Sequence, residues 1–158
     1  MSLFALNILL AVVWQSLTAT FTLGSLVSGF ALGYGVLWMV QPLFAERSPY
    51  FLRVWRIARL IGFFLYELVV SSIRVAWDVL TPEHQSRPAI IEMPLDVRSD
   101  IEILLVTNLI SLTPGTLSLD VTPDRKTLIV HAMFADDPEA LVRDLKNGME
   151  RMVKEVFE

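Results

Sequence analysis

The first 45 residues contain no charged side chain, and charged residues then follow from Glu46 onward. A water-soluble core does not use an uncharged apolar run of this length, whereas one helical crossing of a bilayer requires about 20 apolar residues. A cleaved signal peptide does not fit, because no basic residue precedes Leu3 and the apolar character continues past any cleavage point. The run is long enough for two crossings, so the sequence predicts a transmembrane hairpin over residues 1–45.

Two apolar helices are expected in this hairpin, at residues 3–17 and 23–40, with a threonine-rich turn at 18–22. The arginines that follow, Arg47, Arg53, Arg56 and Arg59, predict a cytoplasmic flank, because basic flanks remain on the cytoplasmic side. Two crossings then place the N-terminus in the cytoplasm as well. Buried ionisable side chains mark ion paths through membranes, and the polar groups that we single out in the two spans are only Gln15 and hydroxyls.

Small residues recur at every fourth position of the second span, at Ser25, Gly29 and Gly33. One face of that helix is therefore nearly bare backbone, which permits close approach of another helix. We expect this face to be a helix-packing interface. The sequence leaves open whether it packs against the first span or against a neighbouring protein chain.

Residues 46–82 form a basic juxtamembrane stretch with five arginines and three carboxylates. On a helical projection one sector of about 60° contains Arg53, Arg56, Glu67, Ser71, Arg74 and Asp78, and Arg59 lies about 60° to one side. The remainder is apolar. A third crossing would bury Glu67 and Arg74 at a cost and would export the following domain. We favour an amphipathic helix that lies in the membrane interface. Its expected contacts with lipid or neighbouring subunits are Arg53, Arg56, Arg59, Glu67, Arg74 and Asp78.

Residues 83–158 carry a net charge of −6 and indicate a small cytoplasmic α/β domain after a polar linker, Glu83 to Pro88. Strands are expected at 89–93, 116–121 and 127–134. Ser99 and Glu102 form a capping-box pattern that opens a helix to about Leu112. A second helix starts near Asp136, and its buried stripe comprises Leu141, Leu145, Met149, Met152, Val153 and Val156.

The order of these elements is strand, helix, strand, strand, helix. A right-handed crossover makes the first two strands parallel, and a hairpin at 122–126 places the apolar third strand antiparallel between them. The predicted fold is a βαββα sandwich, ferredoxin-like but without the last strand. One side of the helix at 100–112 is expected to meet the interfacial helix, lipid or a partner, because it is apolar nearly all round.

Residues with catalytic or ligand-binding chemistry are few. The absence of cysteine excludes disulfides, thiolate catalysis and cysteine-ligated metals. His84 and His131 show no metal-ligand spacing, and no glycine-rich phosphate loop follows a strand. The acidic domain argues against nucleic acid as a partner. We therefore predict no catalytic residue, cofactor site or metal site.

The most specific segment is Asn108-Leu-Ile-Ser-Leu-Thr-Pro-Gly-Thr-Leu-Ser-Leu-Asp120, followed by Asp124-Arg-Lys-Thr-Leu-Ile-Val-His-Ala-Met133. It resembles the signature of the E subunit of multisubunit cation/proton antiporters of the Mrp type, and the resemblance extends over the whole chain. It implies a subunit of a bacterial or archaeal inner-membrane complex that exchanges sodium or another monovalent cation for protons, with ion translocation in the large subunits. The signature residues Asn108, Thr113, Pro114 and Gly115 are interpreted as structural.

The sequence suggests three hypotheses about the function of the chain. The leading hypothesis is an accessory, non-catalytic membrane subunit of such an antiporter, whose partners are the other subunits and membrane lipids. The alternative is a stand-alone, membrane-tethered cytoplasmic binding domain. A self-sufficient small transporter is the least favoured, because the two spans lack ionisable side chains.

Overall fold

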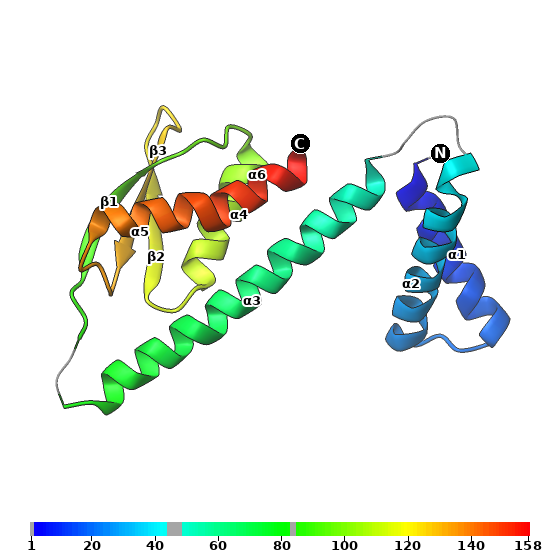
Figure 1. Ribbon diagram of the computed structural model, residues 1–158, viewed down its shortest axis with the longest axis horizontal. Coiled ribbons are helices and arrows are strands. Elements are labelled where there is room, and N and C mark those ends of the chain that lie inside the picture. The colour runs from blue at the N-terminus through cyan, green and yellow to red at the C-terminus, as the bar shows by residue number, and fades with distance from the viewer. Residues whose placement is uncertain (1, 44–48, 83–84) are drawn as a thin grey trace. The chain divides into compact units, whose positions relative to one another are not determined.

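The computed structural model describes residues 2–43, 49–82 and 85–158 and contains two compact units, residues 1–54 and 55–158 (Figure 1). The boundary between these units falls within one long helix, α3, Tyr50–Leu80. The predicted end of the uncharged segment at residue 45, and Glu83 and His84 of the predicted linker, lie outside the described residues.

The first unit contains a helical hairpin of α1, Leu3–Thr18, and α2, Leu23–Val40, followed by a short 3₁₀ turn, η1, Gln41–Leu43. The Thr22 side chain accepts a hydrogen bond from the Ser25 N–H and so caps α2. Ala19 ends α1 in the left-handed conformation, with φ of 49°. The two predicted helices and the turn between them are therefore confirmed as secondary structure.

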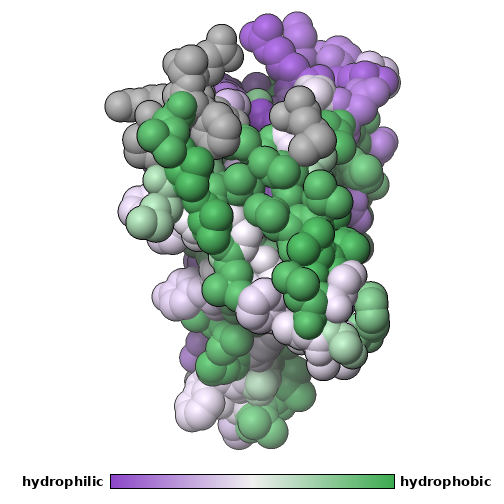
Figure 2. Space-filling view, turned by 90° about the vertical axis from the view of Figure 1, so that its right-hand side faces the viewer, coloured by the Kyte–Doolittle hydropathy of each residue, from purple (hydrophilic) through white to green (hydrophobic). Residues whose placement is uncertain are grey.

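The helices differ in whether they are long enough to cross a bilayer. Of the described helices, α2 with 18 residues and α3 with 31 are long and apolar enough to cross a membrane. The 16 residues of α1 extend about 24 Å at the usual helical rise, less than the roughly 30 Å of a hydrocarbon core. Figure 2 shows that hydrophobic residues cover most of the hairpin surface that faces the viewer.

The second unit contains a three-stranded sheet of β1, Ala89–Pro94, β2, Thr116–Val121, and β3, Thr127–Ala132. The strand order is β1-β3-β2, and β3 is antiparallel to both neighbours, as the sequence predicts. Leu128, Val130 and Ala132 of β3 are fully buried, which explains why the most apolar strand is central. The strand ends at Ala132 and is two residues shorter than expected.

Two helical segments join the sheet in this unit. The first is α4, Asp100–Leu112, which begins with the predicted capping box between Ser99 and Glu102. The second consists of α5, Pro138–Leu145, a π turn η2, Lys146–Glu150, and α6, Arg151–Phe157. The expectation of one regular helix is wrong at η2. There the added Cβ of an alanine at Gly148 would lie 2.9 Å from Phe63 Cζ, so α3 packs directly on this turn.

The hydrophobic core of the second unit lies between the sheet and these helices. Its buried members come from the sheet and from the helices that cover it: Ile91, Met93, Val97, Ile103, Val106, Ile110, Leu128, Val130, Met149 and Val153. Leu60, Phe63 and Phe64 of α3 pack against the same cluster. Burial of three such side chains contributes several kcal/mol, at about 1.5–3 kcal/mol for each when fully buried. Helix α3 from residue 55 onward is thus an integral part of this unit.

Candidate functional site

The glycine face of α2 packs against α1 of the same chain. A Cβ added at Gly29 would lie 2.9 Å from Trp14 Cβ and 3.1 Å from Ala11 Cα, and one added at Gly33 would lie 3.2 Å from Leu10 Cβ. Ser25 lies nearer the turn, where its hydroxyl accepts a hydrogen bond from Thr20 Oγ1 at 3.1 Å. The structure therefore places the two glycines in the intrachain alternative that the sequence left open.

Asn7 is the polar residue of the hairpin that the sequence reasoning passed over. Its side chain is fully buried, and its Nδ2 donates to the Tyr50 hydroxyl at 2.7 Å. Tyr50 also packs edge-on against Phe51, which in turn contacts Tyr34 with ring centroids 5.1 Å apart. The signal available in the sequence was an amide side chain within the predominantly apolar segment 3–17. Asn7 therefore joins the hairpin to the first turn of α3.

The polar stripe of α3 faces the α/β domain. Arg56 Nη1 donates to the Glu155 carbonyl at 2.6 Å, and Arg59 Nη1 lies 3.4 Å from Glu155 Oε2. At the other end of the helix, Arg74 lies over the Phe134 ring, with Cζ 5.9 Å from the ring centroid. These arginines hold α3 on the domain through partners within the same unit.

Asp78 ends this stripe as a buried helix-to-linker contact. Its Oδ1 accepts hydrogen bonds from the backbone N–H groups of Gln85 and Ser86, the second at 3.0 Å. Glu67 is half-buried, and its carbonyl accepts a hydrogen bond from the Ser71 hydroxyl. Arg53 is exposed and belongs to the first unit. Of the six residues expected to contact lipid or subunits, four thus bind the domain of their own chain.

The opposite face of α3 is apolar and exposed. Its exposed large hydrophobic residues extend over the whole helix: Leu52, Trp55, Ile57, Ile61, Leu65, Tyr66, Val69, Ile73, Trp77, Val79 and Leu80. A contiguous apolar surface of this length marks contact with lipid or with another protein.

The signature segment includes the turn between α4 and β2. The Thr113 hydroxyl donates to the Leu109 carbonyl at 2.9 Å, and the Thr116 hydroxyl donates to the Ile110 carbonyl at 2.6 Å. Gly115 adopts a φ of 90°, a conformation that favours glycine, and its carbonyl accepts from the Met133 N–H at 2.7 Å. These contacts satisfy the last carbonyls of α4. They agree with a structural role for Thr113 and Gly115.

Two further signature residues have simpler surroundings. The Asn108 Nδ2 donates to the Leu104 carbonyl at 2.7 Å, one turn earlier in α4. Pro114 follows the C-terminal end of α4. Proline has no N–H to donate within a helix, and helices usually end at or before the residue that precedes it.

A buried glutamate, absent from the residues that the sequence singled out, organises the turn after β1. Glu150 is 1% exposed, and its Oε1 accepts from the N–H groups of Asp96 and Val97 at 2.5 Å and 3.2 Å. Lys146 Nζ lies 3.4 Å from Glu150 Oε2 and 2.9 Å from Asp96 Oδ2. The hydrogen bond from Lys146 lowers the pKa of Asp96. Burial opposes the charge on Lys146, but its hydrogen bond to Asp96 and the charges of both carboxylates outweigh this and raise the pKa of Lys146.

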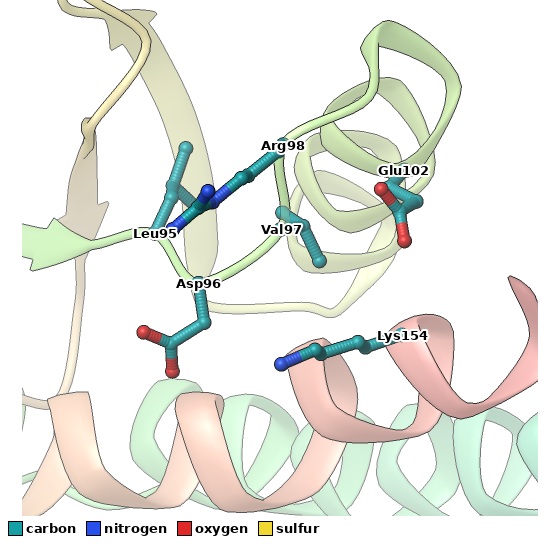
Figure 3. Close-up of a pocket in the computed structure, with 6 residues that line it drawn as sticks. All are labelled: Leu95, Asp96, Val97, Arg98, Glu102 and Lys154. Carbon is teal, nitrogen blue, oxygen red and sulfur yellow. The ribbon is translucent and has the colours of Figure 1, made fainter. Parts of the chain in front are cut away.

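A cavity of about 420 Å³ lies beside this cluster, lined by Leu95, Asp96, Val97, Arg98, Glu102 and Lys154 (Figure 3). Its two carboxylates already have structural partners. Asp96 pairs with Lys146, and Glu102 accepts from the Ser99 N–H at 3.0 Å in the capping box, where the Ser99 hydroxyl lowers the pKa of Glu102. The hydroxyl beside Glu102 is that of Ser99, and the two side chains form the reciprocal cap of α4.

No group of three or more His, Cys, Asp or Glu side chains that could hold a metal ion occurs in the described part of the chain. His131 lies in β3, opposite Ile90 of β1, and His84 lies outside the described residues.

Comparison with known proteins decides the family. Residues 7–156 match the family model described as Na+/H+ ion antiporter subunit. The chain belongs to this family. It is 34% identical over 151 residues to the E subunit of the Na(+)/H(+) antiporter of Alkalihalophilus pseudofirmus, covering 96% of this chain and 95% of that protein. It is 35% identical over 153 residues to the E1 subunit of the Na(+)/H(+) antiporter of Staphylococcus haemolyticus, covering 97% and 96%.

Two solved structures resemble this antiporter-subunit chain. A chain of the Mrp complex from Dietzia sp. DQ12-45-1b is 29% identical, with a TM-score of 0.49 over 63% of this chain and 94% of that one. A chain of the membrane-bound sulfane sulfur reductase, an archaeal respiratory membrane complex, is 24% identical, with a TM-score of 0.61 over 98% of both. The second likeness shows the fold. The family and the apolar helices identify a membrane protein, and the resemblance seen in the sequence is confirmed.

Proposed function

We propose that the chain is an accessory structural subunit of a multisubunit monovalent cation (sodium)/proton antiporter, in which it supports the assembly and function of the ion-translocating subunits. One observation carries this proposal: four of the six charged side chains of α3 contact the α/β domain of the same chain. Arg56, Arg59 and Asp78 all bind residues of that domain, and residues 1–45 contain no charge at all. An ion path requires ionisable groups within the membrane. The chain therefore acts through contacts with its neighbours.

The contacts of α3 also bear on how this helix meets the membrane. They extend from Arg56, which binds Glu155, to Asp78, which binds Ser86. That stretch of helix is about 33 Å long, as long as a hydrocarbon core is thick, roughly 30 Å. If α3 crossed the bilayer, the charged domain packed along it would enter the hydrocarbon at a prohibitive cost.

Helix α3 is therefore proposed to lie along the membrane interface, with its polar stripe beneath the domain and its exposed apolar face in the lipid. Trp55, Tyr66 and Trp77 are exposed on that face. Such amphipathic rings favour the headgroup region. The basic residues after α2 support a cytoplasmic position for the α/β domain and, with two crossings, for the N-terminus, in a bacterial or archaeal cell. The proposed division is a hairpin over 1–45, an interfacial helix over 46–82 and a domain over 83–158.

Two experiments test the proposal. Mild-detergent purification of the tagged chain from its native host, followed by mass spectrometry, is expected to recover large multi-span antiporter subunits in a fixed ratio. A clean monomer that is stable without partners would instead support a tethered binding domain. For the topology, the chain has no native cysteine, so a single cysteine at Asp124, in the exposed β2–β3 turn, can be labelled in intact cells. Labelling from outside would refute the cytoplasmic domain, and the turn residue Phe21→Cys is the control for the opposite side.

A further inference from the structure

The two edges of the sheet differ in how their backbone groups are satisfied. At the β2 edge, the Ser118 N–H donates to the Ser111 hydroxyl at 3.1 Å and the Val121 N–H donates to Asp120 Oδ1 at 2.8 Å. The register also shifts between Ser118 and Asp120, as in a β-bulge. Bulges and side-chain acceptors are the devices by which proteins close an exposed edge.

The β1 edge is open over a short segment. The Leu95 N–H donates to the Lys126 carbonyl at 2.7 Å. In an antiparallel ladder this places the backbone groups of alternate residues, here 89, 91 and 93, toward β3. Ile90 and Glu92 then direct their N–H and C=O groups away from the sheet. Among the described residues, no hydrogen bond reaches these four groups.

The open segment is bounded at its C-terminal end. The Pro94 carbonyl, which also points outward, accepts from Lys146 Nζ at 2.6 Å. The chain thus closes the β1 edge at Pro94, and among the described residues it leaves the segment around Ile90 and Glu92 unpaired.

A groove accompanies this open edge. It has a volume of about 460 Å³ and lies between β1 and the start of α5, lined by Ile90, Ile91, Glu92, Pro138, Glu139, Val142 and Arg143. Ile90 is 66% exposed. Figure 1 shows β1 at the outer side of the sheet, with α5 beside it. An unpaired strand edge next to a groove under a helix is the geometry that binds an extended peptide by strand addition.

The geometry points to strand addition at β1: we propose that an extended segment of a neighbouring subunit binds antiparallel to Ile90–Glu92 as the fourth strand of this sheet. This inference rests on the proposed function. The segment has apolar side chains at alternate positions, which enter the groove beside Val142 and Pro138. It has a basic side chain on the face that carries Glu92, because an opposite charge across a strand pair is favourable.

A second copy of this chain fits the edge less well than an extended segment does. Pairing of β1 with β1 of another copy would bring two α5 helices and two grooves to face each other, so neither groove would receive the alternating side chains of a strand. An extended segment can pair with the four backbone groups of Ile90 and Glu92 and at the same time fill the groove between β1 and α5.

Photo-crosslinking of the intact complex in native membranes tests the inference. A benzophenone amino acid in place of Ile90 is expected to link to one short segment of another subunit, as read by mass spectrometry. The matched control is the same group at Leu119, an exposed apolar residue of the closed β2 edge, where that link should be absent. Links from position 90 only to lipid, only to a second copy or to nothing would overturn the inference.

Edge variants provide a second test with a folding control. Ile90→Pro removes an outward N–H without touching the ladder to β3, and Ile90→Val retains it. The proline variant is expected to reduce co-purification of partner subunits roughly tenfold relative to the valine variant, at equal membrane level and protease resistance. Equal co-purification of both variants would refute strand addition alone. Failure of the wild-type chain to purify with any partner would instead refute the proposed function.

Discussion

Removal of the buried carboxylate at Glu150 should destabilise the second unit strongly. In Glu150→Ala, the N–H groups of Asp96 and Val97 lose their acceptor, and Lys146 loses one of its two carboxylate neighbours. An unsatisfied buried donor costs about 1–3 kcal/mol. Val97 is 2% exposed, so its N–H has no ready access to water. The Asp96 N–H is only partly buried. The expected loss in free energy of unfolding is therefore about 3 kcal/mol, mostly from the Val97 donor and the lost charge contact.

Glu150→Gln separates the hydrogen bonds from the charge. A glutamine keeps one carbonyl oxygen for the two N–H groups and removes only the charge near Lys146, so a loss of about 1 kcal/mol is expected. The exposed Glu139→Ala, whose carboxylate makes a helical contact of 3.8 Å to Arg143, is the matched control and should change stability by less than about 0.5 kcal/mol.

Thermal unfolding of the full chain in mild detergent measures these differences. A loss of 1 kcal/mol lowers Tm by about 4–8 °C in a unit of this size, so Glu150→Ala should unfold at least about 10 °C below the wild type. If alanine and glutamine lowered Tm equally, the backbone acceptor role would be wrong and charge alone would account for the effect. If alanine matched the Glu139→Ala control, the cluster would contribute nothing to stability.

Two further predictions concern the hairpin and pH. Gly33→Val should push α1 away from α2 and lower the Tm of the hairpin, because even a Cβ at residue 33 would meet Leu10. Gly35→Val should leave the Tm unchanged, because nothing lies within 4 Å of a Cβ at that site. Equal effects of the two variants would refute the assignment of Gly33 to the packing face. Because folding lowers the pKa of Asp96, this residue stabilises the fold at pH values above its unfolded pKa, and the contribution is lost as the pH falls through its folded pKa. Because folding raises the pKa of Lys146, that residue stabilises the fold at pH values below its unfolded pKa, and the contribution is lost as the pH rises through its folded pKa. Unfolding curves should therefore show a plateau near neutral pH that falls at both ends, and a maximum at either extreme would contradict this pairing.

Local patterns in the sequence predicted most elements of this fold correctly. The bounds of α2 and β2 and the capping box of Ser99 depend on neighbouring residues alone, so they could be inferred from spacing and residue type. The position of β3 between β1 and β2 followed from the right-handed crossover and the hairpin turn.

Contacts between distant residues were not predictable in the same way. The π turn at 146–150 and the burial of Glu150 depend on Phe63 and on the backbone of Asp96, which lie far away in the sequence. The stripe of α3 looked equally suited to lipid headgroups and to protein, because a charged face is the same pattern in both cases.

The sequence by itself determined that the chain begins with an uncharged apolar hairpin, continues with an amphipathic helix and ends in an acidic α/β domain, because each property is a periodicity or a charge count along the chain. Only the tertiary structure decided which surface each face meets. Gly33 meets α1, Arg56 meets Glu155, and Ile90 meets no described residue across the β1 edge. The physical reason is that burial and hydrogen bonding belong to pairs of groups, and the chain must fold before those pairs exist.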